Sequence, residues 1–366
     1  MNAALLLGAG LVVLVAGAEL LVRGASRLAL VVGVPPLIIG LTVVAYGTSA
    51  PELSVTTLAT LAGRSDIALG NVVGSNVFNV LFILGLSALI LPLRVSRPLV
   101  RRDVPLMILA GVVFLLMALD GRIGRADGSL LVGGVVLYTI HLIRGGRREM
   151  IAAEEEAGVK PAHTSMAGAI VLVVLGLALL VLGAKWLVDG ATTVARVLGL
   201  SELVIGLTIV AGGTSLPELA TSVLATIRGE RDLAVGNVVG SCIFNILMIL
   251  GTAGLLKGVD VAPGALHFDI PFMIAVSVAC LPVFFTFGEI NRTEGALFLF
   301  YYAAYLVFLF LMNTSHDALS SYSRIMVLYV GPATLLALIF SLWQWHRHRA
   351  RRPAPAGTPR ARAAPR

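Results

Sequence analysis

Two carboxylates stand in segments that are otherwise apolar enough to lie in a membrane. Glu52 ends the sequence GTSAPE, and Glu218 ends the similar sequence GTSLPE, 166 residues further along the chain. In each copy a threonine stands four residues and a serine three residues before the glutamate, so the side chains are neighbours on a helix surface. A charge inside hydrocarbon is costly and indicates a functional site. The candidate polar residues are Glu52, Glu218, Thr48, Thr214, Ser49 and Ser215.

A proline stands directly before each glutamate. Pro51 has no N–H, and its ring clashes with the carbonyl of the residue four positions earlier, Gly47. Gly213 and Pro217 repeat this arrangement in the second copy. We expect both helices to kink or break here and to free carbonyl oxygens near the middle of the bilayer. Such oxygens are tolerated in a membrane only beside a cavity, another helix or a bound cation.

The stretch that follows each copy is also repeated, as GNVVGSNVFN at 70–79 and GNVVGSCIFN at 236–245. Its serine and its last asparagine are four residues apart and therefore lie on the same face of a helix. They either belong to the polar site or form hydrogen bonds between helices. Its glycines have the spacing of close helix packing, and its first asparagine is interpreted as structural. These residues are Ser75, Asn79, Ser241 and Asn245 for the site, Gly70, Gly74, Gly236 and Gly240 for packing, and Asn71 and Asn237 for structure.

Oxygen is the only ligand type in this set, with no pair of histidines or cysteines at metal-ligand spacing. Hard cations such as Ca²⁺ and Na⁺ prefer oxygen ligands, and Ca²⁺ accepts about 6–8 of them in flexible sites. Two glutamates neutralise one Ca²⁺, whereas the same pair with neutral oxygens can hold Na⁺ ions or protons instead. Competition of these ions for one site is the physical basis of exchange.

The composition excludes a soluble globular protein. The 366 residues are 58% hydrophobic and 13% charged, with a mean hydropathy of +0.95, whereas soluble domains carry about 25% charged residues. The net charge of +7 does not indicate a nucleic-acid partner, because most lysines and arginines lie in short loops between apolar blocks. Cys242 and Cys280 lie inside apolar segments and are interpreted as small buried hydrophobes rather than a disulfide.

Apolar blocks of about 20 residues, the length that crosses the hydrocarbon core, predict the membrane spans. The hydrophilic stretch 145–166 is expected to be a cytoplasmic linker between two halves, 1–144 and 167–312. A further span at 325–345 precedes a basic tail, 346–366, which we expect to be disordered and close to membrane lipid. The other spans are expected at 3–22, 34–62, 66–91, 104–119, 129–144, 167–188, 201–227, 232–256, 270–288 and 295–312.

The positive charges predict the orientation. With the N-terminus outside, the cytoplasmic loops and the tail receive 20 of the 27 lysines and arginines, as membrane topology requires. The first arginines, Arg23 and Arg27, follow the first apolar run, which favours a retained first span over a cleaved signal peptide. We expect a multi-pass protein of the cell (plasma or inner) membrane with its C-terminal tail in the cytoplasm.

The two polar segments, 40–85 and 206–251, occupy the second and third and the seventh and eighth expected spans. Five spans separate them, and an odd separation means that they cross the membrane in opposite directions. The predicted fold is therefore an all-α integral membrane protein with an inverted repeat of five plus five helices. Its second and seventh helices are broken, an eleventh helix lies outside the symmetry, and the site lies between the halves.

The paired GTS-x-PE and GN-x-x-GS-x-x-FN motifs, repeated in inverted halves, resemble the calcium/cation antiporter superfamily. The resemblance is greatest to its prokaryotic sodium/calcium exchanger branch, in which the two segments are called alpha repeats. It covers the first ten spans, and the doubled motif is highly specific. The resemblance implies a ten-helix core with four central ion sites arranged in a diamond.

By motif position, the resemblance implies that the ion sites share the carboxylates of Glu52 and Glu218. It also implies that spans one and six slide across the core; here these spans carry Gly17, Gly24, Gly183 and Gly190. Two features depart from the pattern: the core usually ends at ten spans, and some prokaryotic relatives carry an aspartate where this chain has a neutral asparagine, which bears on ion stoichiometry. The other implied ligands are oxygens of Ala45, Thr48, Ser49, Ala211, Thr214, Ser215, Ser75, Ser241, Asn79 and Asn245.

We therefore expect secondary active exchange, in which Ca²⁺ moves outward as Na⁺ moves inward. The chain has no phosphate-binding G-x-x-x-x-G-K-[ST] loop to indicate an ATP-driven pump. Exchange of Ca²⁺ for H⁺ is the alternative, and the motif favours sodium. An intramembrane hydrolase using Ser49 or Ser215 has no duplicated histidine as base, and a passive channel fits proline-broken inverted repeats less well. The expected partners are Ca²⁺, Na⁺ and membrane lipid, with no cofactor and a monomeric chain.

Overall fold

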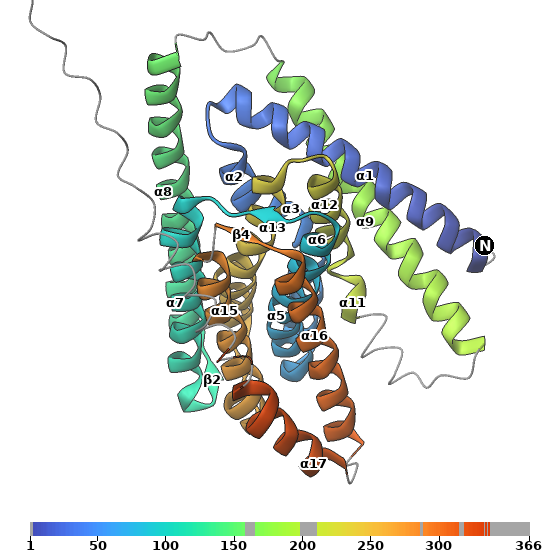
Figure 1. Cartoon of the computed structure of the whole chain (residues 1–366). Helices are drawn as coiled ribbons and strands as arrows, with labels where there is room; N and C mark the ends of the chain where they lie inside the picture. Colours follow the sequence, from blue (N-terminus) through green and yellow to red (C-terminus); the bar gives the residue numbers. More distant parts are fainter. Residues whose placement is uncertain are drawn as a thin grey trace, which may run out of the picture.

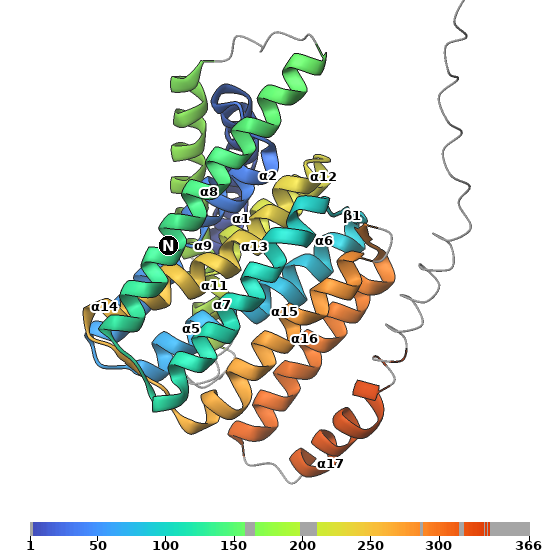
Figure 2. The same ribbon diagram turned by 90° about the vertical axis from the view of Figure 1, so that its left-hand side faces the viewer.

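The computed structural model describes residues 3–157, 165–197, 211–285, 288–314 and 318–332, together with Thr334 and Leu336. Figures 1 and 2 show a bundle of long helices joined by short connections. Among the described residues, eight helices are long and apolar enough to cross a membrane. The bent pair Pro36–Thr48 and Ala50–Leu61 makes a ninth if it counts as one span. The predicted class, an all-helical integral membrane protein, is confirmed.

The first half of the chain runs from α1 to α8. Its helices and strands are α1 (Ala3–Val32), α2 (Pro36–Ile39), α3 (Ala45–Thr48), α4 (Ala50–Leu61), α5 (Ser65–Val77), α6 (Gly85–Ile90), β1 (Leu93–Arg94), α7 (Val104–Met117), β2 (Arg122–Ile123) and α8 (Arg125–Ala157). Four helical turns of other types join them: the π-helical turns η1 (Gly40–Val44), η2 (Phe78–Leu84) and η3 (Leu99–Asp103), and the 3₁₀ turn η4 (Ala118–Asp120).

The second half repeats this order. Its helices and strands are α9 (Met166–Val197), α11 (Ala211–Gly213), α12 (Leu216–Ile227), α13 (Arg231–Phe244), α14 (Gly251–Leu256), β3 (Val259–Asp260), α15 (Ile270–Phe285), β4 (Glu289–Ile290) and α16 (Arg292–Asn313). The π-helical turns η6 (Asn245–Leu250) and η7 (Ala265–Asp269) occupy positions equivalent to η2 and η3. The first part of the expected seventh span, 201–210, lies outside the described residues.

Three helices extend well beyond the expected spans. Helix α1 continues ten residues past the expected end at 22, α8 continues to Ala157 through much of the expected linker, and α9 continues to Val197. A helix of 30 residues is about 45 Å long, more than the hydrocarbon core of about 30 Å requires. These helices therefore continue past the apolar stretch of sequence that a membrane span needs. Helix α1 ends just before Gly33, which has a positive φ of 69°.

The expected eleventh span is described only in part. Helix α17 (Ala318–Ile325) and the π-helical turn η8 (Met326–Val330) begin before and within the range 325–345. The hydroxyl of Tyr322 donates to the carbonyl of Ala304 at 2.8 Å, which ties α17 to α16. Figures 1 and 2 show α17 lying across the end of the bundle, next to the C-terminal end of α16. The basic tail lies outside the described residues.

Two short antiparallel ladders connect the halves, a feature that the sequence did not predict. Strand β1 pairs with β4, with Leu93 opposite Ile290, and β2 pairs with β3, with Ile123 opposite Val259. Each ladder joins a loop of one half to a loop of the other. Figure 1 shows β4 and β2 at opposite ends of the bundle. The ladders therefore hold the two halves together at both ends of the helices.

Helices α1 and α9 pack against each other along stripes of glycine. Figure 1 shows them side by side and inclined to the other long helices. A Cβ added at Gly17 would lie 2.6 Å from the backbone nitrogen of Leu180, and one added at Gly176 would lie 2.5 Å from that of Leu21. Small residues at such positions let two backbones approach closely in a membrane. The pair α1–α9 is therefore a closely packed unit.

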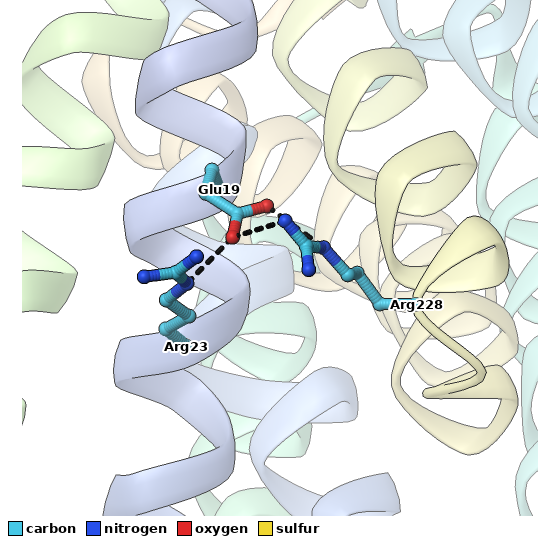
Figure 3. Close-up of polar contacts among 3 residues, drawn as sticks. All are labelled: Glu19, Arg23 and Arg228. Atoms are coloured by element: carbon cyan, nitrogen blue, oxygen red, sulfur yellow. Dashed lines mark hydrogen bonds and ion pairs between the residues drawn. The ribbon is translucent and has the colours of Figure 1, made fainter.

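An ion pair ties α1 to the core helix α12. Figure 3 shows Glu19 of α1 between Arg23 on the same helix and Arg228 at the C-terminal end of α12. Arg228 donates from Nη2 to Glu19 Oε1 at 2.6 Å and from Nε to Oε2 at 3.0 Å. Nothing in the sequence indicates this pairing, because Arg228 is 209 residues away from Glu19.

The glycine stripe between α1 and α9 predicts opposite effects of the same substitution at two positions of α1. Gly17→Ala forces the added Cβ against the backbone of α9, and over-packing of this kind costs about 1–3 kcal/mol. Gly8 is exposed and has no described atom within 4 Å of an added Cβ. Gly8→Ala is expected to leave the unfolding free energy unchanged or raise it by up to about 1 kcal/mol, because alanine favours helix. Denaturant unfolding of both variants in detergent checks this, and equal effects would contradict the packing role.

Candidate functional site

The helix break in each polar segment falls at a serine. Ser49 separates α3 from α4 with φ −81° and ψ 10°, and Ser215 separates α11 from α12 with φ −89° and ψ 10°. The bend between the two helical parts is 46° in the first copy. Pro51 and Pro217 lie at the second position of the new helix, where a missing N–H costs nothing. The chain thus restarts a helix just before each glutamate.

The glycines of the two motifs let α9 approach the broken helices. A Cβ added at Gly47 would lie 2.6 Å from Leu177 of α9, and one added at Gly213 would clash with Val188 of the same helix. The sequence analysis placed these glycines next to the expected helix break. In the structure they lie in the turn before it, and their lack of a side chain makes room for α9.

Each serine at a break reaches across to the glutamate of the other half. Ser49 Oγ donates to Glu218 Oε1 at 2.8 Å, and Ser215 Oγ donates to Glu52 Oε1 at 2.8 Å. The two bonds are equivalent under the internal repeat. Both glutamates are 1% exposed, so the polar contacts lie deep inside the bundle. The two halves of the predicted site therefore form one cluster.

The serines of the second motif complete this cluster. Ser241 Oγ is 3.0 Å from Ser49 Oγ and 3.5 Å from the carbonyl oxygen of Ala45. Ser75 Oγ is 3.3 Å from Ser215 Oγ, which is the equivalent contact in the other half. Each polar group thus contains a serine from one half and a glutamate and serine from the other.

Four buried oxygen atoms at the centre have no hydrogen-bond partner among the described residues. They form two pairs related by the repeat: Oε2 of Glu52 and Glu218, and Oδ1 of Asn79 and Asn245. The asparagines are 1% and 0% exposed. An unsatisfied buried acceptor costs about 1–3 kcal/mol, and a charged one costs more. Buried acceptors of this kind are atoms whose bonding a cation would satisfy.

The π-helical turns explain how the asparagines are placed. Asn79 is the second residue of η2, and Asn245 is the first residue of η6. A π-helical turn inserts a residue into the helix and shifts the side chains around it, and such turns occur often at functional sites. The sequence predicted a continuous helix here, because spacing alone does not distinguish an α-helical from a π-helical turn.

The first asparagine of each motif supports the broken helices, in agreement with its structural interpretation. Asn71 Nδ2 donates to the carbonyl of Glu52 at 3.1 Å and to Thr56 Oγ1 at 2.9 Å. Asn237 Nδ2 donates to the carbonyl of Glu218 at 3.3 Å and to Ser222 Oγ at 2.9 Å. Each asparagine therefore holds the backbone of the glutamate whose side chain enters the site.

The remaining candidate residues lie around the same break. Thr48 is fully buried, and its Oγ1 is within hydrogen-bonding distance of the carbonyls of Val44 and Ala45 and of Asn237 Oδ1, at 3.0, 3.3 and 3.2 Å. The carbonyl of Ala45 also accepts the N–H of Ser49 at 3.0 Å. Thr214 is half-buried beside Ser215, and Ala211 begins α11.

One polar residue at the site was missed by the sequence analysis. Asn76 is 2% exposed, and its Oδ1 accepts a hydrogen bond from Asn245 Nδ2 at 3.4 Å. It escaped notice because the second copy of the motif has Cys242 at the equivalent position. A search for residues shared by the two copies cannot find a residue that occurs in only one of them.

The arrangement can bind hard cations inside the membrane. It contains two carboxylates, which interact electrostatically, and several neutral oxygens. Within the described residues, neither carboxylate forms an ion pair with a basic side chain, and no group of three or more His, Cys, Asp or Glu side chains is arranged to hold a metal ion. A site with few charges and many neutral oxygens suits Ca²⁺ or Na⁺ better than a transition metal. An inverted repeat with such ligands from both halves is the architecture of a membrane cation transporter.

Comparison with known proteins agrees with this class. The family model described as sodium/calcium exchanger protein matches residues 2–144 and 168–311. The sodium/calcium exchanger MaX1 of Methanosarcina acetivorans is 35% identical over 342 residues, which cover 84% of this chain and 98% of the relative. The inner membrane protein YrbG of Escherichia coli is 39% identical over 286 residues, covering 75% of this chain and 86% of YrbG.

A solved structure is similar over the same region. The sodium-calcium exchanger NCX_Mj, soaked with zero Na⁺ and Ca²⁺, has a TM-score of 0.74 and 30% sequence identity, covering 84% of this chain and 98% of that chain. The chain belongs to the sodium/calcium exchanger family. It is a multi-pass membrane protein and a cation antiporter, not an enzyme, which excludes the hydrolase and channel alternatives.

The supporting role of the first asparagines predicts a loss of stability when they are replaced. Asn71→Leu and Asn237→Leu each leave a backbone carbonyl and a hydroxyl of the broken helix without their donor. Each is expected to lower the unfolding free energy by about 1–3 kcal/mol. Ser54→Ala is the control, because this exposed hydroxyl on α4 bonds only within its own helix; it should change stability by less than about 0.5 kcal/mol. Denaturant unfolding measures all three, and asparagine variants as stable as the control would disprove the support.

Proposed function

We propose that this chain exports Ca²⁺ from the cell in exchange for Na⁺, by alternating access to a site between its two halves. The observation that carries the proposal is the set of four buried oxygens without hydrogen-bond partners, on Glu52, Glu218, Asn79 and Asn245. Two of them belong to carboxylates, so one Ca²⁺ or two Na⁺ would balance the charge of the site. Mutually exclusive occupancy by these ions couples the movement of one to that of the other.

The hydrogen bonds between the halves support alternating access at this site. Every ligand group contains residues of both halves, so a relative movement of the halves changes the site and the exposure of its ions together. The closely packed pair α1–α9 is the element that moves in the proposal, since it is attached to the core through α12 by an exposed ion pair. The Arg228 side chain is about half exposed, so this ion pair can break and re-form during transport.

Ion identity, orientation and assembly also belong to the proposal. Relatives named as sodium/calcium exchangers support Na⁺ and Ca²⁺ as the transported ions. The name of YrbG supports the inner membrane as the location. The distribution of lysines and arginines supports an external N-terminus, a cytoplasmic linker and a cytoplasmic tail. Each chain contains a complete site, which supports a monomer as the functional unit.

Exchange of Ca²⁺ for H⁺ is the second candidate. The observation that favours it is the burial of both carboxylates, because burial in a medium of low polarity favours the protonated form of a carboxyl group. Protons would then replace Na⁺ as the competing ions at the same oxygens. The two candidates differ in which ion gradient drives Ca²⁺, so a transport assay separates them.

Purified protein in vesicles provides that assay. An outward Na⁺ gradient is expected to drive uptake of radiolabelled Ca²⁺ well above the level of protein-free vesicles, and a pH gradient alone is not. Vesicles with equal Na⁺ on both sides are the control for leakage. Uptake that follows the pH gradient and ignores Na⁺ would overturn the sodium assignment in favour of protons.

The two glutamates can be tested in the same vesicles. Glu52→Gln and Glu218→Gln each remove one of the two charges that balance Ca²⁺, so Na⁺-driven uptake is expected to fall to the level of protein-free vesicles. Glu289→Gln is the matched control, because Glu289 lies in the short ladder of β4, and it should leave uptake within about twofold of the parent. Normal uptake by both site variants would disprove the assignment of the site.

A further inference from the structure

Asn76 is the middle member of a series of three side chains joined by two hydrogen bonds. Asn245 Nδ2 donates to Asn76 Oδ1 at 3.4 Å, and Asn76 Nδ2 donates to Met273 Sδ on α15 at 3.3 Å. All three residues are at most 2% exposed. Asn76 belongs to the first half of the chain, and the other two belong to the second half.

The direction of these two hydrogen bonds follows from the chemistry of Met273. A thioether sulfur has no hydrogen to donate and can only accept a hydrogen bond. The amide nitrogen of Asn76 must therefore face Met273, which turns its oxygen toward Asn245. Asn245 in turn must present its amide nitrogen to Asn76. Its own oxygen then points elsewhere, and it is one of the four buried oxygens without a partner.

This direction matters because only one end of an amide can bind a cation. An asparagine side chain rotated by half a turn would present its NH₂ group instead of its oxygen, with nearly the same shape. A carboxylate in the same place has two equivalent oxygens and needs no such control. A neutral asparagine ligand therefore requires a partner for its NH₂ group, and Asn76 supplies one.

The other half of the chain has a different side chain at the position equivalent to Asn76. Met107 stands at the position equivalent to Met273, but Cys242 stands at the position equivalent to Asn76. The thiol of Cys242 lies 3.9 Å from the backbone oxygen of Asn76, to which it donates. The side chain of Cys242 also interacts with that of Asn79, so the equivalent contact to Asn79 is made by a sulfur atom instead of an amide.

We propose that Asn76 is a positioning residue, which keeps the amide oxygen of Asn245 turned toward the transported cations. The proposal rests on the proposed function, because it takes Asn245 as a cation ligand. Partners that orient metal ligands without touching the metal typically contribute about 10–100-fold to affinity. Loss of the acceptor at position 76 therefore weakens cation binding without removing a ligand.

The test compares Asn76→Leu in two backgrounds. Leucine is similar in shape to asparagine but offers no acceptor, so Asn76→Leu is expected to weaken the binding of Ca²⁺, Na⁺ or both by about tenfold or more. In the Asn245→Asp background the same substitution is expected to change affinity by less than about twofold, because a carboxylate needs no orientation. Equilibrium binding of radiolabelled Ca²⁺ to purified protein, with Na⁺ as competitor, measures both affinities. An equal loss in both backgrounds would show that Asn76 acts only through packing and would overturn the proposal.

Two further variants keep the result unambiguous. Asn76→Ala removes the amide acceptor without adding a branched apolar side chain, and the same loss is expected if Asn76→Leu folds poorly. Ser277→Ala removes a buried hydroxyl that bonds to the carbonyl of Met273, and it is expected to leave affinity unchanged. Unchanged affinity in Asn76→Leu and Asn76→Ala would overturn this inference alone. Absence of cation binding by the unmodified protein would instead overturn the proposed function.

Discussion

Two carboxylates buried in hydrocarbon are the constraint on which the rest of this structure depends. Glu52 and Glu218 are almost fully buried, and neither has a basic partner among the described residues. One oxygen of each accepts a serine hydroxyl from the other half of the chain, and the second oxygen has no partner. The broken helices, the asparagines that hold them and the ladders that join the halves all serve to keep these unpaired oxygens together.

The sequence was sufficient to predict the fold class and most of the polar residues that the structure brings together, but not Asn76. A proline and a glutamate inside an apolar segment indicate a polar site in the membrane. The duplication of this segment indicates that its two copies form one site. The bonds from Ser49 to Glu218 and from Ser215 to Glu52 bring together residues predicted from these two signals. Such inferences succeed because they depend on chain chemistry and periodicity, which are properties of the local sequence.

The features that could not be predicted depend on contacts between distant segments. The partner of Glu19 is 209 residues away, and the pairing of β1 with β4 involves only two residues in each strand. The π-helical turns at Asn79 and Asn245 consist of the same kinds of residue as the neighbouring α-helices, so the sequence does not distinguish them. The sequence places Gly47 next to the expected helix break, and only the position of α9 shows that this glycine makes room for a neighbouring helix. These features arise from packing, which no pattern within one segment records.

The symmetry of the ligands makes the differences between the halves informative. If both halves were identical, the two states of an inverted repeat would be related by a two-fold rotation and would have equal free energy, and neither membrane face would be preferred. The groups around the site break this equality: Arg228 pairs with Glu19, whereas the equivalent positions carry Ala62 and Lys185. Asn76 faces Asn245, whereas Cys242 takes its place in the other half. An exchanger needs equivalent ligands to hold the same ions from either side, and it needs unequal surroundings if its two states are to differ in free energy.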